Sequence, residues 1–67
     1  STNDGLAGAA KNIGALMARK HIYFVPVRQD DPEGKPTSLV ADMTQVTAAI
    51  AAALEGRQLQ PVLLGAR

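Results

Sequence analysis

The sequence contains no cysteine and a single histidine, and these two shortages exclude several kinds of site. Without cysteine the chain forms no disulfide and offers no thiolate ligand to a metal. One histidine cannot supply a zinc site built from histidines. We therefore expect no metal site. A chain of 67 residues must also hold a marginal core together without any cross-link.

Aromatic residues and net charge are scarce as well. Only Tyr23 and Phe24 are aromatic, and the formal net charge is +1. The basic residues are scattered along the chain, which argues against a nucleic-acid-binding face. No apolar run approaches the roughly 18 residues of a membrane span, and no signal-peptide pattern is present. We expect a cytoplasmic protein that binds neither nucleic acid nor membrane.

A helical period predicts a first helix at about residues 5–20. Thr2, Asn3 or Asp4 can accept the free amide groups of its first turn. An acidic residue at this end also suits the positive pole of the helix dipole. Its apolar stripe consists of Leu6, Ala9, Ala10, Ile13, Leu16 and Met17.

An apolar run without polar alternation predicts a strand at about residues 21–26. Such a run is typical of a parallel strand that is buried on both faces by helices. Pro26 cannot donate to a strand ladder and marks the end of this strand or a bulge. Residues 27–41 then predict a long polar loop, broken by prolines and a glycine, of the kind that forms lids or binding loops.

A second helix is predicted at about residues 43–55. Asp42, with Gln45 three residues later, resembles a capping box, and Gly56 suits the left-handed position after the last turn. An extended tail, residues 57–67, follows. A single buried strand needs parallel neighbours, and this chain offers at best its tail. The order therefore predicts an α/β fold, a helix–strand–loop–helix segment that is incomplete on its own.

Two polar segments are candidate binding sites. Ser1–Asp4 precedes the first helix, where free amide groups can bind an anion, although a plain helix cap needs the same residue types. Lys35 and Ser38 lie in the long loop and can close over an anionic substrate, or simply keep the loop soluble. Asp30, Asp31 and Glu33 are interpreted as a solvated turn.

Several short segments, in one order, resemble a known family. The pieces that carry the resemblance are "STNDGL", "KNIG", "IYFVP", "QDDP", "SLVADM" and "ALEGRQLQPVL". Together they resemble the C-terminal third of a member of the flavoprotein family that includes phosphopantothenoylcysteine decarboxylases and flavin prenyltransferases. The resemblance implies a Rossmann-like parallel three-layer fold, assembled as trimers or multiples of trimers around FMN. The main flavin-binding motifs of that family have no counterpart in these residues.

The decarboxylase branch of this family carries a Pro-x-Met-Asn-x-x-Met loop whose Asn contacts the substrate. Asn3 takes the position of this Asn and Leu6 that of the second Met, whereas Thr2 replaces the first Met. The resemblance therefore implies a substrate or flavin contact at Asn3, with Ser1, Thr2 and Asp4 beside it. The two replaced methionines argue against decarboxylase specificity.

The member that the chain resembles is one component of a bacterial synthase that makes an aromatic dicarboxylate for spores. This implies a dicarboxylate substrate, a place in the cytoplasm of the mother cell, and a partner protein that binds NAD(P). It also implies that the remaining part of the same flavoprotein fold packs on this segment, which alone would be inactive. Two alternatives stay open: another FMN-dependent enzyme such as a decarboxylase, and a non-catalytic fragment that only mediates assembly. No catalytic residue is assigned.

Overall fold

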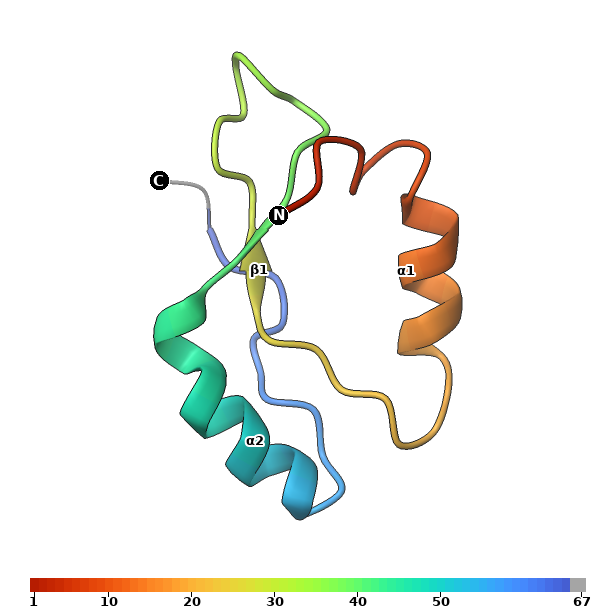
Figure 1. The fold of residues 1–67 in the computed structure, drawn as a ribbon, viewed down its shortest axis with the longest axis vertical. Coiled ribbons are helices and arrows are strands. Elements are labelled where there is room, and N and C mark those ends of the chain that lie inside the picture. The colour runs from red at the N-terminus through yellow and green to blue at the C-terminus, as the bar shows by residue number, and fades with distance from the viewer. Residues whose placement is uncertain (66–67) are drawn as a thin grey trace.

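A computed structural model of the chain describes residues 1–65, in which extended segments from distant parts of the sequence pair side by side. Strand β1 (Val27–Arg28) pairs antiparallel with β2 (Val40–Ala41). Just before β2, Leu39 forms an antiparallel bridge with Thr2. On the other side of β1, Val27 forms a parallel bridge with Leu63 of the tail. The two helices lie to either side of β1 in Figure 1.

The strand expected at residues 21–26 has no regular pairing within residues 1–65, where the first paired strand starts at Val27. Residues 22–26 find no neighbouring strand within the described part of the chain. Instead, the side chain of Gln58 bonds both backbone groups of Phe24, and the carbonyl of Pro26 accepts the amide of Asp42. A strand that is buried on both faces needs continuous neighbours. The parallel neighbours of this run were expected outside the chain, and that expectation stays a prediction.

The loop expected at residues 27–41 is a β-hairpin whose two strands are each two residues long. Val27 lies opposite Ala41, and Arg28 lies opposite Val40. The turn between the strands holds its shape through local bonds. The amide of Lys35 donates to the carbonyl of Asp31 over 2.8 Å. The loop is therefore an ordered hairpin that projects at the top of Figure 1.

The first helix, expected at residues 5–20, is α1 (Ala10–Met17) and is shorter at both ends. Residues 3–9 form turns, in which the carbonyl of Asp4 accepts the amides of Ala7 and Ala9. Gly5 and Gly8 lower the helix propensity of this stretch. The amide of Leu6 also donates to the carbonyl of Thr37 over 2.9 Å. The long-range contact outweighs the local helical pattern.

The second helix follows the expectation more closely. A short 3₁₀ turn, η1 (Met43–Gln45), leads into α2 (Val46–Leu54). Gly56 has φ +76°, and its amide donates to Ala53 while that of Arg57 donates to Ala52. These two bonds form a Schellman motif, the most common way for a helix to end at glycine. The tail, expected at residues 57–67, pairs with β1 near Leu63; residues 66 and 67 lie outside the described part.

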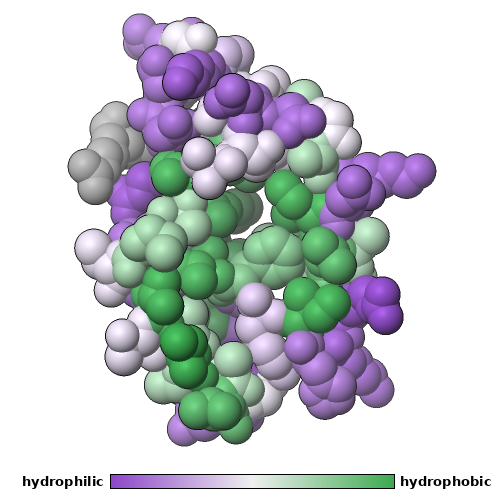
Figure 2. Space-filling model, in the orientation of Figure 1, coloured by the Kyte–Doolittle hydropathy of each residue, from purple (hydrophilic) through white to green (hydrophobic). Residues whose placement is uncertain are grey.

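The core of the described chain is small. The buried hydrophobic residues are Leu39, Ala49 and Ala52, of which Ala52 is only 1% exposed. The accessible surface is 4691 Å², whereas a compact protein of this mass exposes about 4,000 Å². Figure 2 shows the consequence, a wide apolar area over the middle of one face and along α2. Large apolar side chains are exposed on η1 and α2, Met43 by 71% and Leu54 by 84%.

Candidate functional site

The N-terminal segment lies against the hairpin, at the point where Figure 1 shows the chain end beside β2. Thr2 and Leu39 exchange two backbone hydrogen bonds of 2.9 Å each. The hydroxyl of Thr37 donates to the carbonyl of Asn3 over 2.7 Å. The structure therefore brings Ser1–Asp4 next to residues 37–39, which include the predicted site residue Ser38. These two polar segments are far apart in the sequence and were singled out separately.

Asp4 does not cap α1, which corrects the expected helix cap. Its carboxylate accepts the Thr2 hydroxyl over 2.6 Å, and the helix begins six residues later at Ala10. Ala9, at the N-cap, makes no side-chain capping bond. The amide groups that an anion would use at a helix start are therefore not presented by Ser1–Asp4. Any binding by this segment has to use its side chains and its own turn.

Lys35 lies at the exposed tip of the hairpin. Its carbonyl accepts the amide of Ser38 over 3.1 Å, so the backbone joins the two predicted residues through one turn. Its charge acts on Asp30, where it is one of the causes that lower the pKa of the carboxyl. Lys35 thus acts electrostatically on the hairpin itself.

Ser38 is 1% exposed, and its hydroxyl forms no hydrogen bond of normal geometry within residues 1–65. The register of the hairpin, continued by two residues along each strand, places Asp30 opposite Ser38. The Ser38 hydroxyl lies near enough to be the main cause that holds the pKa of Asp30 below its usual value of 3.8. The Asp30 carboxylate is therefore the group toward which the buried Ser38 hydroxyl is directed.

Arg28 and Asp42 form an ion pair beside Asp30. The Nη2 of Arg28 lies 2.9 Å from Oδ2 of Asp42, with both side chains largely covered. Asp42 also accepts the amide and hydroxyl of Thr44 and the side-chain amide of Gln45. These bonds, that of the Thr44 hydroxyl first, lower the pKa of Asp42 to about 2. The acceptor positions of the Asp42 carboxylate are therefore largely occupied. Asp42 caps η1 and holds the Arg28 guanidinium in place.

A hollow of about 450 Å³ opens over this pair. It is lined by Arg28, Asp30, Val40, Ala41, Asp42, Met43 and Thr44. Sequence reasoning missed Arg28 and read Asp30 as part of a solvated turn. Two short strands around an eleven-residue connection leave no clear hairpin signal, so the cross-strand position of Asp30 and Ser38 could not be read in advance.

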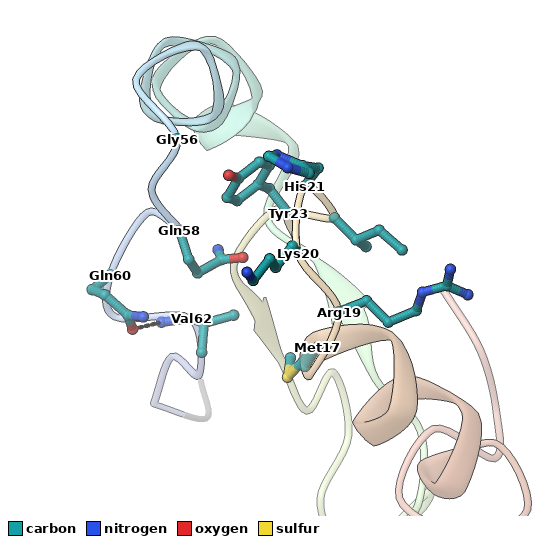
Figure 3. A pocket seen from close by; sticks show the side chains of 10 residues that line it. Met17, Arg19, Lys20, His21, Tyr23, Gly56, Gln58, Gln60 and Val62 are labelled. Carbon is teal, nitrogen blue, oxygen red and sulfur yellow. Dashed lines mark hydrogen bonds between the residues drawn. The ribbon is translucent and has the colours of Figure 1, made fainter.

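Two other hollows are present in the described chain. The larger, about 530 Å³, lies between the end of α1 and the start of the tail, and Figure 3 shows its side chains. Lys20, His21 and Tyr23 contribute polar atoms there, whereas Arg19 extends away from the others in this view. His21 has φ +66°, a left-handed conformation that is uncommon outside glycine. None of the predicted site residues lines this hollow.

The third hollow is apolar and measures about 240 Å³. Ser1 and Thr2 lie at its edge, and Phe24 and Leu39 are among its apolar walls. It is the only one of the three that reaches the predicted N-terminal residues. It offers an apolar surface to a planar ring, but no cluster of donors for a ribityl phosphate. The described residues therefore do not form a complete FMN site by themselves.

No group of three or more His, Asp or Glu side chains among residues 1–65 is arranged to hold a metal ion. No helix in the same range is both long and apolar enough to cross a membrane.

Comparison with known proteins gives a consistent result. Over 64 residues the chain is 47% identical to the B subunit of dipicolinate synthase from Bacillus subtilis (strain 168), and the match covers 96% of this chain. The crystal structure of the dipicolinate synthase B subunit from Bacillus halodurans C superposes with a TM-score of 0.94 at 55% identity, again over 96% of this chain. No protein-family model matches the chain.

The chain spans about a third of the length of these relatives, 32% of the first and 33% of the second. The predicted fold class, a helix and strand segment of a larger Rossmann-like α/β fold, is confirmed by the structural match. Membership in a larger fold also accounts for the large apolar surface, because further elements of such a fold would pack against it.

Proposed function

We propose that this chain, which is related over nearly its whole length to the B subunit of dipicolinate synthase, contributes the substrate-binding hairpin and N-terminal turn of such a protein. The single observation that carries the proposal is the match over 96% of the chain in both sequence and backbone. The reaction proposed is the formation of dipicolinate from a dihydro- or hydroxy-tetrahydro-dipicolinate precursor. The hydroxy-tetrahydro precursor would have to lose water and then two hydrogens, whereas the dihydro precursor would have to lose only the two hydrogens.

The substrate contacts proposed are Asn3 and Ser38, with Ser1, Thr2 and Asp4 beside Asn3. Their proximity supports this assignment, because the Thr37 hydroxyl bonds the carbonyl of Asn3 and Ser38 follows directly in the sequence. A substrate with two carboxylates needs donors at two places. The amide of Asn3 and the hydroxyl of Ser38 can each donate to one of them. Lys35, at the hairpin tip, adds a positive charge to the same hairpin.

FMN and a second protein complete the proposed enzyme. FMN would supply the electron acceptor, held mostly by residues that this chain does not contain. The partner would be the A subunit of the synthase, which would bind NAD(P), and the assembly would be a trimer or a multiple of one. The place of action would be the cytoplasm of the mother cell of a sporulating bacterium. No step of the chemistry is assigned to a residue of this chain.

The test uses the protein at its natural length, purified with and without its partner. We expect a flavin absorption spectrum, binding of dipicolinate by calorimetry, and formation of dipicolinate from the precursor in the complex. The variant Asn3→Ala is expected to weaken dipicolinate binding about tenfold, the value of a hydrogen bond to a charged group. The control Asn12→Ala removes the same amide from an exposed position on α1. Unchanged binding in Asn3→Ala would contradict the assignment.

The second candidate is another FMN-dependent enzyme, such as a decarboxylase. The observation in its favour is Asn3, at the position of the substrate-binding Asn of that branch, while Thr2 and Leu6 depart from its methionines. Titration with dipicolinate and with carboxylates derived from cysteine separates the two. Binding of the cysteine derivatives alone would replace the first candidate by the second.

A non-catalytic assembly fragment is the third reading. It predicts that the 67 residues form a stable oligomer that contains no flavin. A yellow preparation, or an isolated chain that does not fold, would contradict it.

A further inference from the structure

Four hydrogen bonds attach the N-terminal turn to the hairpin within residues 1–65. Thr2 and Leu39 exchange two of them through their backbones, and the amide of Leu6 donates a third to the carbonyl of Thr37. The fourth is the only one that uses a side chain, because the hydroxyl of Thr37 donates to the carbonyl of Asn3. The turn is therefore held at both ends by main-chain bonds and between them by one side chain.

The two peptide groups on either side of Asn3 are both bound to the hairpin. The carbonyl of Thr2, in the peptide group before Asn3, accepts the amide of Leu39 over 2.9 Å. The carbonyl of Asn3, in the peptide group after it, accepts the hydroxyl of Thr37 over 2.7 Å. Because each peptide group is planar, fixing both of them fixes φ and ψ of Asn3 and with them the direction of its side chain. Without the Thr37 hydroxyl, only the first group stays bound.

The side-chain amide of Asn3 is a free donor on this turn. The hydroxyl of Thr2 donates to the carboxylate of Asp4 over 2.6 Å, and the same hydroxyl lies 3.4 Å from the amide of Asp4. Asn3 is exposed, and the one hydrogen bond that it makes within residues 1–65 is the bond from its carbonyl to Thr37. Its side chain can therefore donate to a ligand while its backbone is held.

The turn lies close to the hairpin independently of the Thr37 side chain. A Cβ at Gly5 would lie 2.8 Å from the side chain of Leu39, so the backbone of the turn is in direct contact with the hairpin. The three main-chain bonds also use no atom of the Thr37 side chain. A substitution at Thr37 can therefore remove the bond to Asn3 while the turn stays docked.

We propose that Thr37 is a positioning residue, whose hydroxyl orients Asn3 for its contact with a carboxylate of the substrate. This deepens the proposed function and rests on it, because the Asn3 amide is the donor proposed there for one of the two carboxylates. A binding group has to be held within about 0.5 Å of its productive position by the residues around it. Thr37 acts on binding through Asn3 and makes no contact with the substrate.

The test is a double-mutant cycle, measured as the affinity for dipicolinate by calorimetry on the protein at its natural length. We expect Thr37→Val to weaken binding about fivefold, within the range of one hydrogen bond. Thr37→Ser keeps the hydroxyl and should retain the wild-type affinity within about twofold. In the Asn3→Ala background, Thr37→Val should cause no further loss, because residues that act through one contact are not additive. Thr47→Val removes a hydroxyl from an exposed position on α2 and should leave the affinity unchanged.

A merely structural role for Thr37 predicts a different result. Thr37→Val would then weaken binding by the same factor with and without Asn3, and this additivity would overturn the inference. Unchanged affinity in Thr37→Val, or an equal loss in Thr37→Ser, would overturn it too. Thr37→Ala also lacks the hydroxyl and serves as the second variant, with the same expected loss.

Failure of the proposed function gives a separate signal. Asn3→Ala with reduced affinity, together with an unaffected Thr37→Val, would overturn only the inference. Equal affinities in the wild type and Asn3→Ala would overturn the assignment of Asn3 on which it rests. A wild type that binds no dipicolinate would overturn the proposed function itself.

Discussion

Gln58 takes the place of a neighbouring strand for Phe24. Its side-chain oxygen accepts the Phe24 amide over 2.7 Å, and its side-chain nitrogen donates to the Phe24 carbonyl over 2.6 Å. A primary amide has the same donor and acceptor as a peptide group, so one side chain completes the pattern that a strand would supply. This pair fixes the apolar run before β1 to the segment that follows α2.

The first prediction concerns this pair. Gln58→Glu keeps the acceptor for the Phe24 amide but places a second acceptor against the Phe24 carbonyl. We expect a loss of about 1–3 kcal/mol in unfolding free energy near neutral pH. Protonation restores a donor and favours the folded state, so the pKa of the introduced carboxyl is raised and the loss should shrink as the pH falls through that value. Urea denaturation at several pH values measures this, with Gln58→Leu as the pH-independent comparison. A loss that does not vary with pH would contradict the pairing.

The second prediction uses two glycines. A Cβ added at Gly5 would lie 2.8 Å from the Leu39 side chain, which is 93% buried, whereas one added at Gly14 would meet nothing within 4 Å. Gly5→Ala should therefore cost about 1–3 kcal/mol through overpacking. Gly14→Ala, in the middle of α1, should stabilise the protein by about 0.5–1 kcal/mol. Chemical denaturation of both variants at natural length measures this. Equal effects at the two positions would contradict the close approach of the N-terminal turn to Leu39.

The third prediction concerns pH. Bonds from Thr44, Gln45 and Arg28 lower the pKa of Asp42 from 3.8 to about 2 in the folded state. A carboxyl with a depressed pKa contributes stability above its unfolded pKa, and this contribution is lost as the pH falls towards the folded value. The unfolding free energy should therefore decline between about pH 5 and pH 2. Asp42→Asn should flatten this decline, whereas Glu33→Gln should leave it unchanged. An equally steep decline in Asp42→Asn would contradict the role of the cap.

The fourth prediction concerns the segment on its own. Three small or medium apolar residues form its buried core, while Met43, Ile50 and Leu54 are more than half exposed. Its radius of gyration is 12.0 Å, against about 10.9 Å for a compact chain of this length. We expect the isolated 67 residues to show no cooperative thermal transition by circular dichroism. A sharp melt of a monomer would contradict the conclusion that its apolar face is covered in the intact fold.

The sequence anticipated the elements that local chemistry decides. The capping of the second helical segment by Asp42 and its end before the left-handed Gly56 were both expected, because a capping side chain and a left-handed glycine act within one turn. The start of α1 was wrong, because the Leu6 amide is bonded to Thr37 on the hairpin. That contact spans half the chain and leaves no local signature.

The candidate site, too, could be predicted only in part from the sequence. Ser1–Asp4 and Ser38 were selected as polar segments, and the structure places them side by side. Arg28 and Asp30 were not selected, because their position depends on a hairpin register that two-residue strands do not reveal. Gln58 was missed for a related reason, since a side chain that replaces a strand cannot be distinguished in sequence from an ordinary polar residue.

The order in which the molecule assembles follows from these long-range bonds. The Phe24–Gln58 and Asn3–Thr37 bonds each join residues that lie 34 positions apart, whereas both helices and the hairpin turn close locally. Contacts between distant residues have a larger loop-closure entropy cost and slow folding. The candidate site is completed only when the Thr2 segment reaches Leu39, so it should be among the last regions to form. In pulsed hydrogen exchange, the amides of Thr2 and Leu39 should gain protection after those of α2. The delay between the two events would measure the time from formation of α2 to docking of the N-terminal segment on the hairpin.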